Sequence, residues 1–268
     1  MKIALVCPAS LPATQFGGIM FLCVDLAREI SKKNNHVTIH TTDLDFANNA
    51  HTFNKNLPRT EKINNFTIKR THVWFTIKLF FINPRMYFEM MNDEPDIIHT
   101  IGIRSFQSLI AAIVSKRKKI PLVISDQGGL TTHPDITCGS FFNKILYKLQ
   151  KPMINFIIRQ SSKISVANEY EERIFLSYAS SSKIKIIRNG INLDEFQKSF
   201  IDFKKKYSIE EPFILFLGRF HIVKGVDILI EAFNLIKNLM SSYLMQATTT
   251  QKIISPKTPH KALVTSFT

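Results

Sequence analysis

The chain has 268 residues, of which 45% are hydrophobic and 21% charged, and 35 Lys and Arg against 21 Asp and Glu give a formal net charge of +14. This balance is typical of a globular chain and excludes an intrinsically disordered one. No apolar run reaches the roughly 18 residues needed to span a bilayer. Three scattered cysteines exclude a disulfide framework and favour a reducing cytoplasm.

The positive charge has three open explanations: nucleic acid, an anionic membrane surface, or a phosphorylated ligand. Lys and Arg occur in short runs along the chain, without the regularly spaced aromatic residues of an RNA-binding sheet. We therefore expect no nucleic-acid partner. Each run also has the simpler interpretation of a solvated helix end.

Short apolar runs alternate with helical patterns, which predicts βαβ units around a parallel sheet. The predicted strands are residues 2–7, 37–40, 66–70, 96–99, 121–125, 163–167 and 185–187. The 3.6-residue period predicts helices over residues 19–30, 106–114 and 141–159, the last kinked at Pro152. Asn168 and Glu171 form an Asn-x-x-Glu capping pattern for a further helix that ends near residue 177.

Two stretches interrupt this rhythm. Residues 43–65 are rich in Asn and are predicted to leave the core as a long excursion. Residues 69–91 are aromatic and have two open interpretations: an amphipathic acceptor or membrane-surface face, or core helices packed on the sheet. The aromatic residues are Trp74, Phe75, Phe80, Phe81, Tyr87 and Phe88.

A second, smaller unit is predicted after the turn at Asn189-Gly190. Residues 213–217 read as a strand and the next apolar period as a helix, and a single strand with a single helix cannot bury its own faces. The sequence therefore predicts a domain over residues 1–192, a linker over 193–211, a truncated second domain over 212–239, and a disordered tail over 240–268.

Two glycine-containing turns are candidates for binding phosphate. Gly17 and Gly18 open the first helix, where backbone N–H groups and the positive end of the helix can face a ligand, although a plain tight turn is the simpler explanation of a Gly-Gly pair. Arg219 and Lys224 lie between a predicted strand and helix, spaced so that both can reach a diphosphate.

Five segments, in this order, resemble the GT-B glycosyltransferases of the retaining family 4. They are residues 17–30, 95–99, 125–130 (Ser-Asp-Gln-Gly-Gly-Leu), 188–192 (Arg-Asn-Gly-Ile-Asn) and 218–227. The resemblance implies an α/β fold with a Rossmann-like N-terminal domain on the acceptor side, followed by a β–α remnant of a second Rossmann-like domain that binds the donor. It also implies that Arg219 and Lys224 hold the diphosphate of a nucleotide-sugar, that Gly17 and Gly18 add backbone donors, and that neither a metal nor a cofactor is needed.

Two departures from the family pattern affect the expected chemistry. Gln127 stands in the loop where the family often carries a His, so it is a catalytic candidate that can hydrogen-bond but cannot exchange protons near neutral pH. The family's Glu-x7-Glu donor motif is absent, because no Asp or Glu follows Glu231.

The function implied by the resemblance is hexosyl transfer, with retention, from a nucleotide diphosphate-sugar to a glycan or lipid-linked acceptor, impaired by truncation. The alternative is a non-catalytic module, formed by the N-terminal domain, that binds an acceptor or a partner. We expect a cytoplasmic protein, and a peripheral contact with an anionic inner membrane face stays open.

Overall fold

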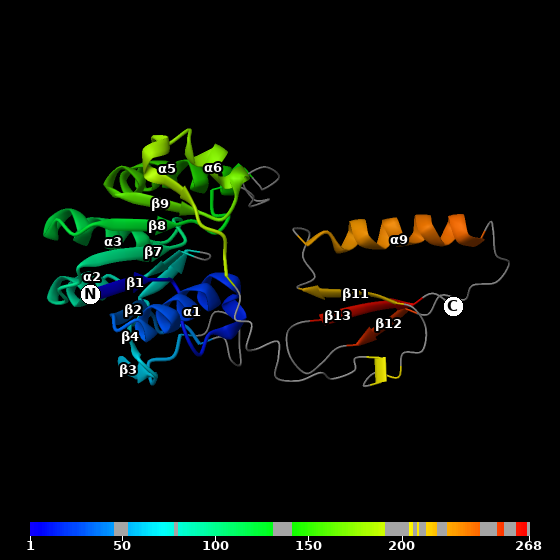
Figure 1. The fold of residues 1–268 in the computed structure, drawn as a ribbon, viewed down its shortest axis with the longest axis horizontal. Helices are drawn as coiled ribbons and strands as arrows, with labels where there is room; N and C mark the ends of the chain where they lie inside the picture. The colour runs from blue at the N-terminus through cyan, green and yellow to red at the C-terminus, as the bar shows by residue number, and fades with distance from the viewer. Residues whose placement is uncertain are drawn as a thin grey trace. The chain divides into compact units, whose positions relative to one another are not determined.

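The computed structural model describes residues 1–45, 53–77, 80–130, 141–190, 204–205, 208, 213–218, 224–241, 251–254 and 261–266. The chain divides into two compact units, Met1–Gly190 (unit 1) and Ile191–Thr268 (unit 2), and each is described by itself (Figure 1). The domain limits inferred from the sequence stay predictions.

Unit 1 is built on an eight-stranded sheet with the order β10-β9-β8-β7-β1-β2-β4-β3. The strands are β1 Lys2–Val6, β2 His36–Thr42, β3 Thr60–Ile63, β4 Phe66–Thr71, β7 Ile97–Ile101, β8 Leu122–Ser125, β9 Lys163–Val166 and β10 Ile184–Ile186. Every neighbouring pair is parallel except β3 with β4. The predicted parallel α/β architecture is confirmed.

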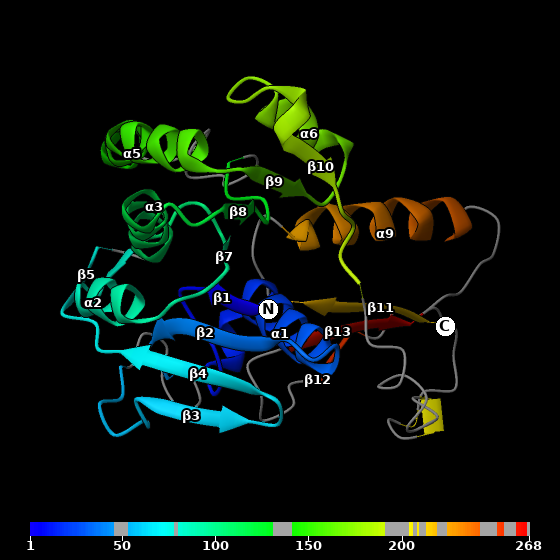
Figure 2. The same cartoon turned by 60° about the vertical axis from the view of Figure 1, so that its left-hand side comes forward.

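Helices cover both faces of this sheet, as the central strand β1 shows (Figure 2). Ala4 and Val6 point into one core, with α2 (Arg85–Asn92), α3 (Phe106–Lys118) and α5 (Phe141–Gln160), whereas Ile3, Leu5 and Cys7 point into the other, with α1 (Gly18–Lys32). Successive side chains of a strand face opposite ways, so a strand buried on both faces is apolar throughout. The continuous run at the start of the sequence has this cause.

The predicted cap of α6 (Glu169–Phe175) is confirmed. Asn168 Oδ1 accepts a hydrogen bond from the Glu171 backbone N–H at 2.9 Å, and Glu171 Oε2 accepts one from the Ala167 N–H at 2.7 Å. These bonds satisfy backbone donors that the helix itself leaves unpaired. The long helix α5 contains Pro152.

The excursion after β2 is more ordered than the sequence suggests. Residues 46–52 lie outside the described part of the chain, but Leu44 is buried and forms an isolated bridge with Phe53, and β3 pairs with β4. Arg70 explains part of this order, because its buried guanidinium donates to the Pro58 and Leu11 carbonyl oxygens and to Glu61 Oε2. Sequence patterning alone does not reveal such side-chain anchors.

Neither interpretation of residues 69–91 describes that segment fully. It forms a hairpin of β5 (Phe75–Ile77) and β6 (Phe80–Ile82), followed by the single helix α2. Phe81 is fully buried and contacts the rings of Phe16 and Phe53, whereas Trp74, Phe75 and Phe88 are exposed. The segment thus contributes both to the core and to the surface.

Unit 2 begins with the predicted strand and helix, β11 (Phe213–Gly218) and α9 (Val226–Ser241). Phe233 of α9 is buried, whereas Ile236, about one helical turn further along, is exposed. The segment predicted as a disordered tail contains β12 (Gln251–Ile254) and β13 (Lys261–Ser266), and β13 pairs antiparallel with both β11 and β12. A strand at the edge of a sheet has unpaired backbone N–H and C=O groups. In β11 these groups form hydrogen bonds with β13. Among the described helices of the chain, none is long and apolar enough to cross a membrane.

Candidate functional site at the carboxyl edge of unit 1

The carboxyl ends of β1, β7 and β8 bring the candidate residues of unit 1 to one edge of the sheet, where open α/β sheets bind their ligands. Gly102 directly follows β7 and lies between the turn into α1, which comes after β1, and the loop that follows β8. Its N–H donates to the Ser125 carbonyl oxygen at 2.8 Å, and a Cβ at this residue would lie 3.8 Å from Cδ1 of Ile19. The start of α1 and the end of β8 are therefore neighbours across Gly102.

The turn into α1 requires glycine at its first position. Gly17 has φ 97° and ψ −153°, a backbone region that is essentially restricted to glycine. A Cβ added to Gly17 or Gly18 would meet no atom within 4 Å, so the space beside this turn is open. The amino end of a 15-residue helix carries unpaired N–H groups and positive potential toward that space. This geometry suits an anionic group.

Asp126 anchors the loop that follows β8. Its buried carboxylate accepts backbone hydrogen bonds from Gly129 at 3.1 Å and Leu130 at 2.9 Å. Burial raises the pKa of this carboxyl to about 6, the nearby Glu171 charge adds to the rise, and the backbone donors of Leu130, Gly129 and Ile103 oppose it. A Cβ at Gly129 would come within 2.5 Å of Asp126 Oδ1, so this glycine permits the contact.

Gln127 is held by an amide pair with Asn189. Asn189 Nδ2 donates to Gln127 Oε1 at 2.7 Å, and Gln127 Nε2 donates to Asn189 Oδ1 at 3.4 Å. The pair joins the β8 loop to the last residues of unit 1, and thus two of the segments that carry the family resemblance. The catalytic role of Gln127 stays a prediction, and its described contacts are those of a positioning amide.

His99, on β7, lies just inside the same edge. Its Nε2 is 2.8 Å from Ser125 Oγ, and burial lowers the pKa of the imidazole to about 4. The ring is therefore neutral at pH 7, and its hydrogen bond to the neighbouring strand is that of a structural residue.

Sequence reasoning missed one pair of polar side chains at this edge. Asp43 follows β2 and His72 follows β4, and Asp43 Oδ2 lies 2.5 Å from His72 Nδ1. Asp43 is buried and also accepts the Val73 N–H at 3.1 Å, whereas His72 is partly exposed. Polar residues directly after two neighbouring parallel strands were the signal that could have identified this pair.

A family model supplies the deciding comparison. The model of Glycosyltransferase Family 4 matches residues 16–195, more than half of the chain. The chain belongs to glycosyltransferase family 4. Unit 1 is the Rossmann-like N-terminal domain of the family's GT-B fold. The match ends before β11, so the assignment of β11 and α9 to the start of the second domain stays a prediction.

Several solved structures are similar to this family 4 chain. Anabaena Alr3699/HepE in complex with UDP is 16% identical over 72% of this chain and 45% of its own, with a TM-score of 0.45. Sucrose-phosphate synthase from Thermosynechococcus elongatus is 12% identical over 73% of this chain and 93% of its own, with a TM-score of 0.45. Acinetobacter baumannii MurG is 12% identical over 75% of this chain and 50% of its own, with a TM-score of 0.40. This chain spans about half the length of HepE. No curated protein matches its sequence.

The two cations that the family resemblance assigns to the donor have different outcomes. Arg219 lies outside the described residues. Lys224 belongs to unit 2, where it is exposed. It is followed by Gly225, which has a positive φ of 62° and directly precedes α9. The described part of the chain holds no group of three His, Cys, Asp or Glu side chains that could bind a metal ion.

Proposed function

We propose that this family 4 protein takes part in hexosyl transfer, with retention, from a nucleotide diphosphate-sugar to a glycan or lipid-linked acceptor. The observation that carries the proposal is the turn at Gly17 and Gly18, a glycine-only backbone with open space beside it at the ligand-binding edge. A diphosphate is the group on such a donor that matches backbone N–H donors and positive potential.

In this proposal the donor diphosphate is held by the N–H groups of Gly17 and Gly18 and by the cations Arg219 and Lys224. The cations stabilise the charge that develops on the departing diphosphate as the bond to the sugar breaks, so no metal ion is required. Gln127 borders the reacting sugar and acts by hydrogen bonding, because a primary amide exchanges no proton near neutral pH.

The test measures thermal unfolding of the full chain with UDP, ADP and GDP, each against the matching nucleoside. A ligand present at 100 times its Kd stabilises the native state by about 2.7 kcal/mol. We expect one diphosphate to raise Tm, and Gly17→Ala and Lys224→Gln to reduce that rise, with Lys185→Gln as a control on the exposed edge strand β10. If no diphosphate raises Tm at millimolar concentration, the donor assignment is wrong.

One observation favours a second candidate, a non-catalytic module in which unit 1 binds an acceptor glycan or a partner. Gln127 stands where the family often carries a His, and its amide exchanges no proton near neutral pH and pairs with Asn189. Incubation with UDP-glucose separates the two candidates. Release of UDP that depends on added acceptor supports transfer, whereas acceptor binding without any UDP release supports the module.

A further inference from the structure

Asp43 and His72 form a polar pair at the carboxyl edge of the sheet that the donor assignment does not use. The side chain of Asp43 is 6% exposed and that of His72 38%, so the carboxylate lies inside the fold while the imidazole reaches solvent. Asp43 Oδ2 lies 2.5 Å from His72 Nδ1, and Oδ1 accepts the Val73 N–H at 3.1 Å. Because a carboxylate oxygen accepts in this contact, the ring proton is on Nδ1.

This orientation determines what the other ring nitrogen of His72 can do. In a neutral imidazole that carries its proton on Nδ1, Nε2 is a hydrogen-bond acceptor. Nδ1 faces the buried carboxylate, so the exposed side of the ring is the one that carries Nε2. No residue in the described part of the chain hydrogen-bonds Nε2. An oriented acceptor at the ligand-binding edge suits the O–H group of a ligand.

The segment that carries His72 is held in place on both sides. Asn83 Nδ2 donates to Thr71 Oγ1 at 2.7 Å, and the Trp74 N–H donates to the Ile82 carbonyl oxygen at 2.8 Å. Together with the two contacts of the carboxylate, these bonds fix four consecutive residues. Side chains on a segment that is already ordered lose less conformational freedom when a ligand binds.

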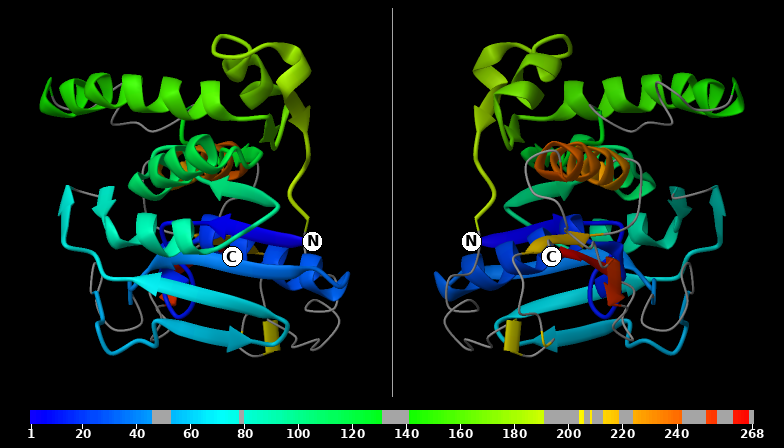
Figure 3. Two further views of the ribbon diagram at one scale, coloured as in Figure 1. Left: turned by 90° about the vertical axis from the view of Figure 1, so that its left-hand side faces the viewer. Right: turned by 90° about the vertical axis from the view of Figure 1, so that its right-hand side faces the viewer.

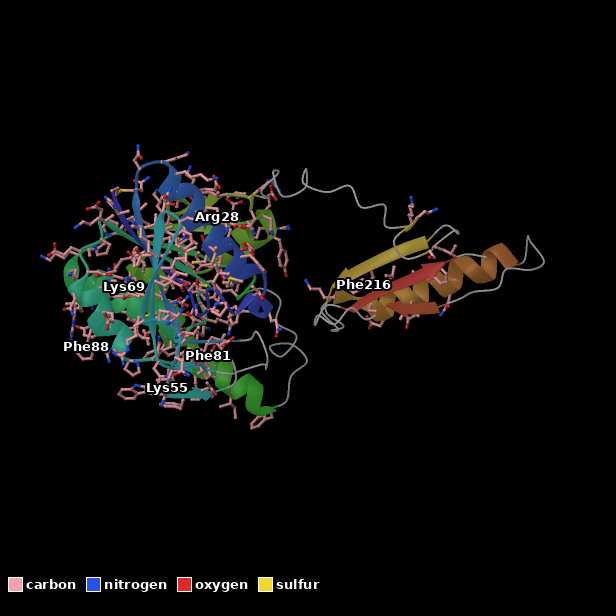
Figure 4. All side chains as sticks on the ribbon, turned by 90° about the horizontal axis from the view of Figure 1, so that it is seen from below. Arg28, Lys55, Lys69, Phe81, Phe88 and Phe216 are labelled. Atoms are coloured by element: carbon pink, nitrogen blue, oxygen red, sulfur yellow. The ribbon has the colours of Figure 1, made fainter. Side chains whose placement is uncertain are left out.

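An aromatic ring lies beside this acceptor in the sequence. Trp74 is 68% exposed, whereas Val73, between it and His72, is buried. Figure 3 shows the β5–β6 hairpin beyond the arrowhead of β4, and the labels of Lys69 and Phe81 in Figure 4 mark the elements on either side of this segment. A sugar ring has C–H groups on its faces and hydroxyls around its rim. An exposed aromatic face with a hydrogen-bond acceptor near it matches both.

Packing connects this segment to the turn into α1. The ring centroids of Phe81 and Phe16 are 6.3 Å apart, and Phe16 directly precedes Gly17. Thr42 Oγ1, next to the carboxylate, donates to the Pro8 carbonyl oxygen at 2.7 Å. Only β2 separates β1 from β4 in the sheet, so their ends are roughly 10 Å apart. This separation is on the scale of a saccharide rather than of a protein partner.

We propose that His72 and Trp74 form a saccharide-binding site in which Asp43 is a positioning residue. His72 Nε2 accepts a hydrogen bond from a sugar hydroxyl, Trp74 packs against the face of the sugar ring, and Asp43 acts through His72 by holding the proton on Nδ1. That the saccharide is the acceptor rests on the proposed function. The binding itself needs no nucleotide.

Trp74 is the only tryptophan of the chain, so its fluorescence reports on the site directly. The full chain is titrated, without nucleotide, with the methyl glycosides of glucose, mannose and galactose and with N-acetylglucosamine at millimolar concentrations. Tetrahydropyran-2-methanol, which has the same ring without its ring hydroxyls, is the control ligand. We expect at least one saccharide to change the emission and to reduce acrylamide quenching, and the control ligand to do neither. If no saccharide has this effect, the proposal is overturned.

His72→Asn separates saccharide binding from a purely structural role. The amide N–H of Asn can still donate to Asp43, but Asn has no counterpart of Nε2. We expect Kd for the saccharide to rise about three- to tenfold, the loss of one hydrogen bond, with little change in Tm. His36→Asn, at an exposed His on the opposite edge of the sheet, is the matched control and should bind as the wild type does. Equal Kd values for His72→Asn and the wild type would show that the pair only anchors the strands.

Nuclear magnetic resonance of the wild type gives a readout that does not depend on the folding of any variant. The chain has eight histidines, so ring nitrogen signals are few. Nε2 of His72 should have the chemical shift of an unprotonated nitrogen and should move when the saccharide is added. A neutral ring with its proton on Nε2, or an Nε2 signal that saccharide leaves unchanged, contradicts the proposal.

The two proposals fail in different experiments. Saccharide binding in a chain that no diphosphate stabilises would remove the donor assignment and leave the saccharide site in place. Stabilisation by a diphosphate in a chain that binds no saccharide would do the opposite.

Discussion

Replacing Asp126 by Asn tests how unit 1 tolerates a buried carboxylate next to the candidate site. The pKa of Asp126 rises from 3.8 to about 6 in the folded chain, chiefly because burial disfavours its charge. Each pKa unit corresponds to 1.36 kcal/mol, so the ionised group lowers the free energy of unfolding by about 3 kcal/mol relative to the protonated one.

The sign follows from the direction of the shift. A carboxyl whose folded-state pKa is raised contributes its full stability well below its unfolded pKa of 3.8, and this contribution is lost as the pH rises through 6. Asp126→Asn has no titrating group at this position. The wild type should therefore lose about 2.4 kcal/mol relative to the variant between pH 4 and pH 7, because about 0.5 kcal/mol is already lost by pH 4.

Urea unfolding followed by far-UV circular dichroism at pH 4, 5, 6 and 7 measures this difference directly. Contributions from titrating groups that do not interact with Asp126 cancel between the two proteins, and the interaction with Glu171 is part of the difference that is measured. Asp25→Asn, at a half-exposed carboxylate on α1, controls for the loss of one negative charge. A wild-type minus Asp126→Asn difference that stays constant with pH would refute the reasoning. A wild type that gains stability with pH would show that the backbone donors outweigh burial.

Three further predictions concern the fold around the site. Gly17→Ala should lower the free energy of unfolding by about 1–3 kcal/mol, because the backbone conformation of Gly17 suits only glycine. Gly18→Ala, inside the first turn of α1, should raise the free energy of unfolding by about 0.5–1 kcal/mol. Urea unfolding compares the two variants. Asp43→Ala should cost about 2–3 kcal/mol in the same assay, since it leaves a buried N–H and His72 without their acceptor; a loss below 0.5 kcal/mol would contradict this. Phe81→Ala should cost about 3–5 kcal/mol by opening a cavity under the β5–β6 hairpin, and a calorimetric Tm equal to that of the wild type would show that the cavity closes.

The sequence determined the architecture of unit 1 and its family. Strands buried on both faces are continuous apolar runs, and the helices between them keep a 3.6-residue period, so each element is visible in its own residues. The cap at Asn168 and Glu171 was also predictable, because both partners lie within one helical turn. The glycines at 17 and 18 pointed to a turn whose backbone only glycine adopts at its first position.

Tertiary structure alone decided the features that depend on residues far apart in the chain. The Gln127 and Asn189 pair joins residues 62 positions apart, and the Asp43 and His72 pair joins residues 29 apart. The order of the strands creates these neighbours, and no local pattern encodes that order. The same holds for the aromatic segment around Trp74, whose residues divide between core and surface according to what packs beneath the hairpin. Local propensity selects the elements, whereas burial and pairing between distant elements select which side chains meet.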